Sequence, residues 1–287
     1  MYNLPMPERL LLISVILLYF ACALIGLFSA KSKVAKLSPL LTHFFSISIV
    51  LESLILVLRA MAIRGNPLTS LFDSMLVLTI VFGLIYLIFS MFIRQVWFGS
   101  VMSGLVFGMI IFTAAVAQPT TVGIANIAAP WTISHVISMS IGEAMIFVAA
   151  ASSYLYLMAD YRLKHKKLDK VMTLIGNLEK TQTVIWIGML TAFISITFGL
   201  VSGVGMALIN VSNGKGAGPA VFFREVDIIL LILAWVLCAS GSLGRRLFQF
   251  KNRLKAYIAL TAFALIVMAI CTSIFSTQHD FVTSVVK

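Results

Sequence analysis

Charged residues are scarce in this sequence of 287 residues: Asp, Glu, Lys and Arg make up 11% of it, while 61% is hydrophobic. Globular soluble chains are roughly half apolar and about a quarter charged. The composition therefore argues against a soluble domain, and the formal net charge of +11 is not taken as a sign of nucleic acid binding. We expect an integral membrane protein whose partners include the lipid bilayer and no nucleic acid.

Cysteine pairs are absent as well. The three cysteines lie singly inside apolar stretches, and no CxxC or CxxCH occurs. A thiol-redox pair, a zinc knuckle and a covalent haem attachment site are thereby excluded. The glycine-rich segment 209–225 lacks the GxxxxGK[ST] spacing of a phosphate-binding loop. With no nucleophile–base pair and no metal-ligand cluster in the sequence, we expect no catalytic activity of the chain's own.

Long apolar runs are what the sequence has in abundance. Eight of them are close to the roughly 20 residues that cross a bilayer as a helix. The first run is too long for a secretory signal and is interpreted as a helix that stays. The sequence predicts an all-α polytopic bundle of about eight transmembrane helices in a single domain, residues 1–287. The predicted spans are 10–30, 39–61, 69–93, 98–117, 132–158, 182–208, 226–244 and 256–276.

The basic residues predict the orientation. Most of the 21 lysines and arginines follow the first, third, fifth and seventh runs, and the alternate breaks hold few. Because positive charge marks the cytoplasmic side of a membrane, the loops 62–68, 118–131 and 209–225 are predicted outside, together with both termini. The alternation keeps its phase along the whole chain, which also supports the count of eight.

Four ionisable residues fall inside the predicted spans, where each costs from about 2.5 kcal/mol upward. Glu52 and Arg59 are seven residues apart and share a helix face, so we expect them to pair within the bundle. Asp73 follows Ser70 and is expected to cap a helix start. For Glu52 and Glu143, structural and functional roles both stay open. The functional one is a proton relay in a small-solute transporter, although no internal repeat or pair of broken helices supports it.

The four histidines differ in what they indicate. His165 lies among lysines in a predicted cytoplasmic loop, and His43 lies near the inner end of the second run. His135 and His279 both fall on the predicted outer face. Two histidines on one side of a membrane bundle can ligate a haem iron through neutral imidazole nitrogens, which makes this pair the candidate metal ligands.

The segment Ala129-Pro-Trp131-Thr-Ile-Ser-His135-Val resembles the Trp-x-x-x-His-Val motif of the CcsA/CcmC/HemX-like cytochrome c assembly family, whose polytopic members handle haem. Trp and His four residues apart share a helix face, so the indole can pack a porphyrin edge beside the axial ligand. Two earlier segments, Gly65–Ser74 and Leu51–Arg59, also resemble segments of that family in the same order. The resemblance covers roughly residues 40–280.

Departures from the family pattern are equally specific. Haem-transferring members carry a tryptophan-rich WGxxWxWD signature in the outer loop before the seventh helix, where this chain reads Val221-Phe-Phe-Arg-Glu-Val-Asp227. Glu52 stands where the family has an intramembrane histidine, and no histidine occurs near 243–244. Glu143 occupies a site that is commonly Tyr. The pattern is therefore closer to the divergent, HemX-like members.

The resemblance implies a protein of the bacterial inner membrane that binds or presents haem transiently at the outer face, working with other membrane or cytochrome assembly proteins. Its implied site has two ligands and three aromatic residues. One alternative is a HemX-like regulator or membrane subunit that has lost haem transfer. The other is the proton-coupled transporter. The implied haem ligands are His135 and His279, and the aromatic residues are Trp131, Phe222 and Phe223.

Overall fold

The structure, a computed structural model, describes residues 4–32, 38–63, 70–92, 96–116, 129–165, 178–212, 223–247 and 251–273. Within these ranges the regular structure is entirely α-helical, and eight helices are long and apolar enough to cross a membrane. The predicted helical class and the predicted count of eight are confirmed. The helices are α1 (Met6–Ser32), α2 (Ser38–Ile63), α3 (Leu71–Phe92), α4 (Val96–Val116), α5 (Ala129–Lys164), α7 (Leu178–Ser212), α9 (Val226–Leu247) and α10 (Asn252–Ser273).

Two helices are longer than a bilayer requires. With 36 and 35 residues, α5 and α7 each extend about 50 Å, whereas the hydrocarbon core is about 30 Å thick. Both run well beyond the predicted spans, because a helix continues into polar sequence after its apolar run has ended. The last turn of α5 carries Arg162 and Lys164. Their positive charges interact favourably with the negative, C-terminal end of the helix dipole.

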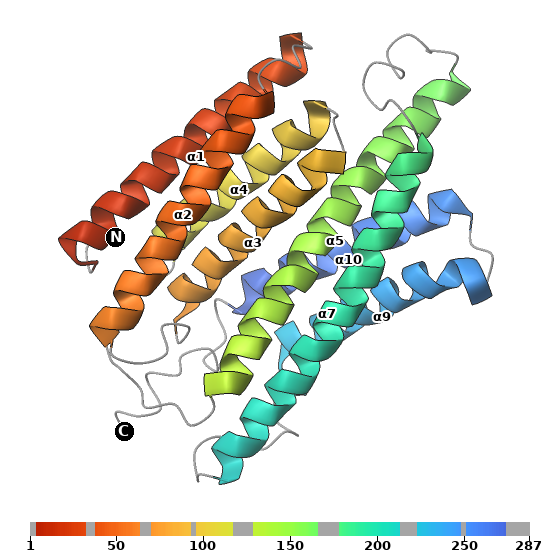
Figure 1. Cartoon of the computed structure of the whole chain (residues 1–287). Coiled ribbons are helices and arrows are strands. Elements are labelled where there is room, and N and C mark those ends of the chain that lie inside the picture. The colour runs from red at the N-terminus through yellow and green to blue at the C-terminus, as the bar shows by residue number, and fades with distance from the viewer. Residues whose placement is uncertain are drawn as a thin grey trace. The chain divides into compact units, whose positions relative to one another are not determined.

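The helices form two compact units. Unit 1 contains α1 to α4, and each of these packs on two others: α1 on α2 and α4, and α3 on α2 and α4. The four helices therefore close a ring in chain order, with neighbouring helices running side by side (Figure 1). Consecutive helices are joined by short breaks, which suits an up-and-down bundle.

Unit 2 contains α5, α7, α9 and α10 and closes a ring in the same way. Its most extensive contact is between α5 and α7, which lie alongside one another (Figure 1). Gly188 makes this close approach possible, since a Cβ there would lie 2.9 Å from the Ala149 Cβ and 3.0 Å from the Met145 carbonyl oxygen. Small residues at helix contacts are typical of membrane bundles.

At one end of unit 2, the end of α5 meets the start of α10. Asp160 and Arg253 form a part-exposed ion pair there, and the Phe147 and Phe263 rings meet edge to face further along the two helices, with centroids 4.7 Å apart. The charge pattern places the breaks after the fifth and seventh runs on one side of the membrane. This ion pair is consistent with that prediction.

Candidate functional site

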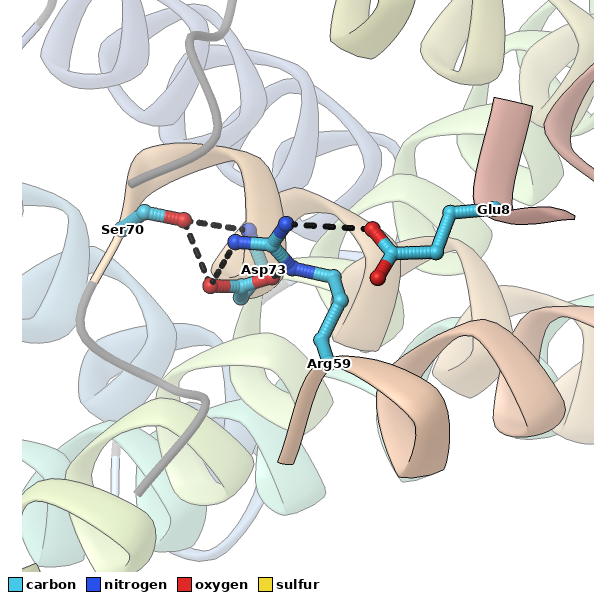
Figure 2. Close-up of polar contacts among 4 residues, drawn as sticks. All are labelled: Glu8, Arg59, Ser70 and Asp73. Carbon is cyan, nitrogen blue, oxygen red and sulfur yellow. Dashed lines mark hydrogen bonds and ion pairs between the residues drawn. The ribbon is translucent and has the colours of Figure 1, made fainter. Parts of the chain in front are cut away.

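The most concentrated group of charges in the described residues lies in unit 1. Arg59, near the end of α2, donates from Nε to Asp73 Oδ1 and from Nη2 to Asp73 Oδ2 at 3.2 Å. Its Nη1 lies 3.5 Å from Glu8 Oε2. Figure 2 shows the guanidinium between the two carboxylates, which come from the first turns of α1 and α3. All three residues are buried, so one cation bridges three helices.

Ser70 holds the Asp73 side of this cluster. Its Oγ accepts a hydrogen bond from the Asp73 backbone N–H at 3.2 Å and donates to Asp73 Oδ2 at 2.6 Å (Figure 2). Because α3 begins at Leu71, the residue that caps the helix is Ser70. Asp73 lies in the first turn of α3 as expected, but the prediction that it caps the helix is wrong, since its backbone N–H is capped by Ser70 and its carboxylate pairs with Arg59. The Arg59 guanidinium also lies 5.2 Å from the centre of the Phe72 ring, within cation–π range.

The predicted pairing of Glu52 with Arg59 is wrong. The buried Glu52 carboxyl group instead lies within hydrogen-bond distance of two hydroxyls, 2.7 Å from Thr79 Oγ1 and 3.1 Å from the Tyr19 hydroxyl. A seven-residue spacing keeps two side chains on one face but separates them by about 10 Å along the helix axis. Side chains of neighbouring helices at the same level are nearer, and they supply the partners of Glu52.

Tyr19 connects the Glu52 group to a buried aromatic cluster. The Tyr19 ring meets Phe45 edge to face at 5.5 Å between centroids, and Phe45 lies 4.1 Å from Tyr86. Tyr86 in turn stacks on Phe98 at 6.0 Å. These rings come from all four helices of unit 1, so the Glu52 group is linked through Tyr19 to an aromatic cluster that the four helices share.

In unit 2, the histidine of the Trp-x-x-x-His motif faces α7. The Nδ1 atom of His135 lies 2.8 Å from the Gly199 carbonyl oxygen. A carbonyl oxygen only accepts hydrogen bonds, so Nδ1 carries the hydrogen. In the neutral imidazole, Nε2 is then the nitrogen that bears the lone pair. The contact with α7 therefore fixes both the tautomer and the direction of the ring.

Trp131 lies one turn before His135 and contacts the same neighbouring helix. A Cβ at Gly205 would lie 2.7 Å from Trp131 Cε3, so only glycine leaves room for the indole against the α7 backbone. The side chain is nevertheless 41% exposed, which leaves much of its aromatic surface uncovered. The prediction that Trp131 and His135 share a helix face is confirmed by their common contact with α7.

Two more of the predicted site residues in unit 2, Phe223 and Glu143, belong to the described residues. Phe223 lies in the turn before α9 and is 45% exposed. His279 and Phe222 fall outside the described residues. Glu143 is half-buried on α5, and none of the described residues hydrogen-bonds to its carboxyl group.

The remaining histidines have local contacts. His43 Nδ1 lies 2.7 Å from the Pro39 carbonyl of its own helix, and the side chain is exposed. His165 is exposed and meets the Tyr161 ring edge to face at 4.4 Å. Within the described ranges no group of three or more His, Cys, Asp or Glu side chains could hold a metal ion.

Sequence reasoning missed four residues of the unit 1 clusters: Glu8, Tyr19, Ser70 and Thr79. Glu8 lies just before the first predicted span, 10–30, and is not among the ionisable residues that fall inside the spans. One signal was present, because Glu8 and Tyr19 are eleven residues apart, which is three helical turns and one face. Another was the Ser70-x-x-Asp73 spacing, which is close to a capping box. No signal of this kind singles out Thr79.

Comparison of the chain with protein-family models, with curated proteins and with solved structures finds no match.

Proposed function

We propose that this membrane protein binds and presents haem at the end of unit 2 where α5 begins, with His135 as an axial ligand of the iron. The observation that carries the proposal is the hydrogen bond from His135 Nδ1 to the Gly199 carbonyl. Histidines that ligate metals commonly donate their other ring N–H to a carbonyl or carboxylate, which fixes the tautomer and raises the basicity of the ligating nitrogen. In this chain that nitrogen is Nε2.

Trp131 supports the same site. Its ring lies one helical turn from His135 and keeps an exposed aromatic surface, which is suited to cover a porphyrin edge. Phe223, also exposed, and Phe222 would add an apolar floor in place of the family's tryptophans. The second axial ligand in the proposal is His279, on the strength of the family resemblance.

In this proposal the residues of the chain bind and orient the haem, and the haem would supply the redox-active iron. The described residues contain no group of three or more metal-ligating side chains. We propose that any reaction at the bound haem is carried out together with other proteins. Membrane or cytochrome assembly proteins of the bacterial inner membrane are the proposed partners, and they would receive haem at the outer face.

The test is a set of visible spectra. Wild type, His135→Ala and His279→Ala are purified in mild detergent after expression with added haem precursor. Two imidazole ligands give low-spin iron, and loss of one ligand is expected to change the spin state before it abolishes binding. His43→Ala is the matched control, because His43 is an exposed histidine bonded within its own helix, and its spectrum should equal that of wild type. Haem that binds without responding to either ligand substitution contradicts the proposed ligands.

A haem-free regulator or membrane subunit is the second candidate function. It is favoured by the helix-packing roles that Trp131 and His135 already have, since both contact α7. On this account the two residues stabilise the α5–α7 pair and nothing more. Wild type without haem above background, together with lowered thermal stability of His135→Ala, would establish it.

A further inference from the structure

Glu52 lies in the middle of α2 and plays no part in the proposed haem site, which belongs to unit 2. Its side chain is completely buried within unit 1. The hydrogen-bond partners of its two carboxyl oxygens are neutral hydroxyls: Tyr19 lies at Oε2 and Thr79 at Oε1. The ion pairs recorded for Arg59 are with Glu8 and Asp73, toward the helix ends.

The hydrogen atoms around Glu52 can be counted. Thr79 Oγ1 lies 2.7 Å from Glu52 Oε1 and 2.8 Å from the Leu76 carbonyl oxygen. A threonine hydroxyl has one hydrogen, which cannot fully serve two acceptors. If Oε1 is protonated, Glu52 donates to Thr79 and Thr79 donates to Leu76. Tyr19 then donates to Oε2, and every close contact contains one hydrogen.

The surroundings also disfavour a negative charge at this position. Between Glu52 and the Arg59 cluster, the three helices carry fully buried apolar residues. On the other side lie the rings packed around Phe45. An unpaired carboxylate in such an environment is so costly that the group takes up a proton instead. The apolar residues between the two polar groups are Leu12, Val15, Ile55 and Leu76.

We propose that Glu52, Tyr19 and Thr79 form a buried proton-binding site in unit 1, in which Glu52 holds a proton and donates it to Thr79. The site joins α1, α2 and α3, so its proton contributes to the contact of three helices. Ser48, one turn before Glu52, places a further buried hydroxyl close to Tyr19.

The charged and titratable groups of the surrounding helices are few. The sequence of α4 contains none. Those nearest the site on the other helices are Tyr19 and Cys22 of α1 and Tyr86 of α3. Toward the helix ends follow Glu8, Arg9 and Lys31 of α1, His43 and Arg59 of α2, and Asp73 of α3.

The experiment is infrared spectroscopy of the full chain in detergent at neutral pH. A protonated carboxyl group has a carbonyl stretch that is separate from the carboxylate bands. Wild type should show such a band, shifted in D2O, and Glu52→Gln should lose it while keeping its melting temperature, since an amide accepts from Tyr19 and donates to Thr79. Glu143→Gln is the matched control and should leave this band in place.

A second variant keeps the test decisive if Glu52→Gln fails to fold. Thr79→Val removes the acceptor of the proton and should move the Glu52 band to higher frequency. Thr113→Val, a buried threonine bonded to Met109 of its own helix, should leave the frequency unchanged. The proposal is overturned by a folded Glu52→Gln protein that retains the whole protonated-carboxyl signal, or by a Thr79→Val band at the wild-type frequency.

Discussion

Units 1 and 2 close their rings of four helices in the same order, but different groups cross between the helices. In unit 1 the crossing groups include ionisable side chains that meet each other, Arg59 with Asp73 and Glu52 with Tyr19. In unit 2 they include ring N–H groups that meet helix carbonyl or hydroxyl oxygens. These contacts are His135 with the Gly199 carbonyl at 2.8 Å, Trp186 with the Ser242 carbonyl at 3.1 Å and Trp235 with Thr197 Oγ1 at 2.8 Å.

The difference has an energetic consequence. A buried charge depends on its partner, because removing one member leaves the other uncompensated. A helix carbonyl oxygen has two lone pairs and uses one of them within the helix, so a side-chain N–H can bond to the other. Removing that side-chain donor leaves the carbonyl with its helical partner and costs only one modest hydrogen bond. Unit 1 should therefore be far more sensitive to single polar substitutions than unit 2.

Membrane orientation is an all-or-none property, because each loop lies on one side of the bilayer or on the other. Charge asymmetry predicts that a reporter fused after Lys170 lies in the cytoplasm and that one fused at the C-terminus lies outside. The Arg59 cluster and the Trp131–His135 motif would then both lie toward the outer surface. A cytoplasmic C-terminal reporter would show that the number of crossings differs from eight.

The next effect is on stability. Arg59→Met leaves Glu8 and Asp73 buried without their cation and should lower the free energy of unfolding by about 3–5 kcal/mol. Adding Asp73→Asn should restore part of the loss, since one of the two uncompensated charges disappears. Equilibrium unfolding in detergent micelles measures both.

The part-exposed Asp160–Arg253 pair of unit 2 is the control for that experiment. Arg253→Met should change the free energy of unfolding by no more than about 1 kcal/mol, as is usual for a solvated ion pair. Equal losses for Arg59→Met and Arg253→Met would remove the distinction drawn between the units.

A smaller effect is expected at the glycine under the tryptophan. Gly205→Ala places a methyl group against the Trp131 ring, and overpacking of this kind costs about 1–3 kcal/mol. Gly108→Ala in α4 is the control, because nothing lies within 4 Å of a Cβ built there, and its effect should stay within about 0.5 kcal/mol. Melting temperatures compare the two, and an undisturbed Gly205→Ala protein would mean that Trp131 is free to shift.

The smallest effect is expected for one hydrogen bond of unit 2. Trp235→Phe removes the bond to Thr197 while leaving an aromatic ring to stack on Phe193, whose centroid lies 5.4 Å away. The loss should be about 0.5–1.5 kcal/mol, measured as a change in the denaturant midpoint. A loss as large as that of Arg59→Met would contradict the modest role assigned to such bonds.

The number of helices and their approximate bounds were predictable because a transmembrane helix depends on the local content of apolar residues. Apolar runs and the spacing of Lys and Arg depend on neighbours in sequence, and they gave the eight helices. Partner choice does not follow from these local features. Glu52 and Arg59 share a face of α2, yet their partners come from α1 and α3, and the sequence alone does not show which residues of those helices lie at the same level. Trp131 and His135 were predictable as a pair, whereas their shared contact with glycines of α7 was not.

The two proposals place haem binding in unit 2 and the protonated carboxyl group of Glu52 in unit 1. The most direct measurement is the dithionite-reduced absorption spectrum of three proteins loaded with haem side by side: wild type, His135→Ala and Glu52→Gln. We expect a low-spin spectrum for wild type, an unchanged spectrum for Glu52→Gln and an altered spin state for His135→Ala. A His135→Ala spectrum identical to wild type, or wild type without haem, contradicts this expectation.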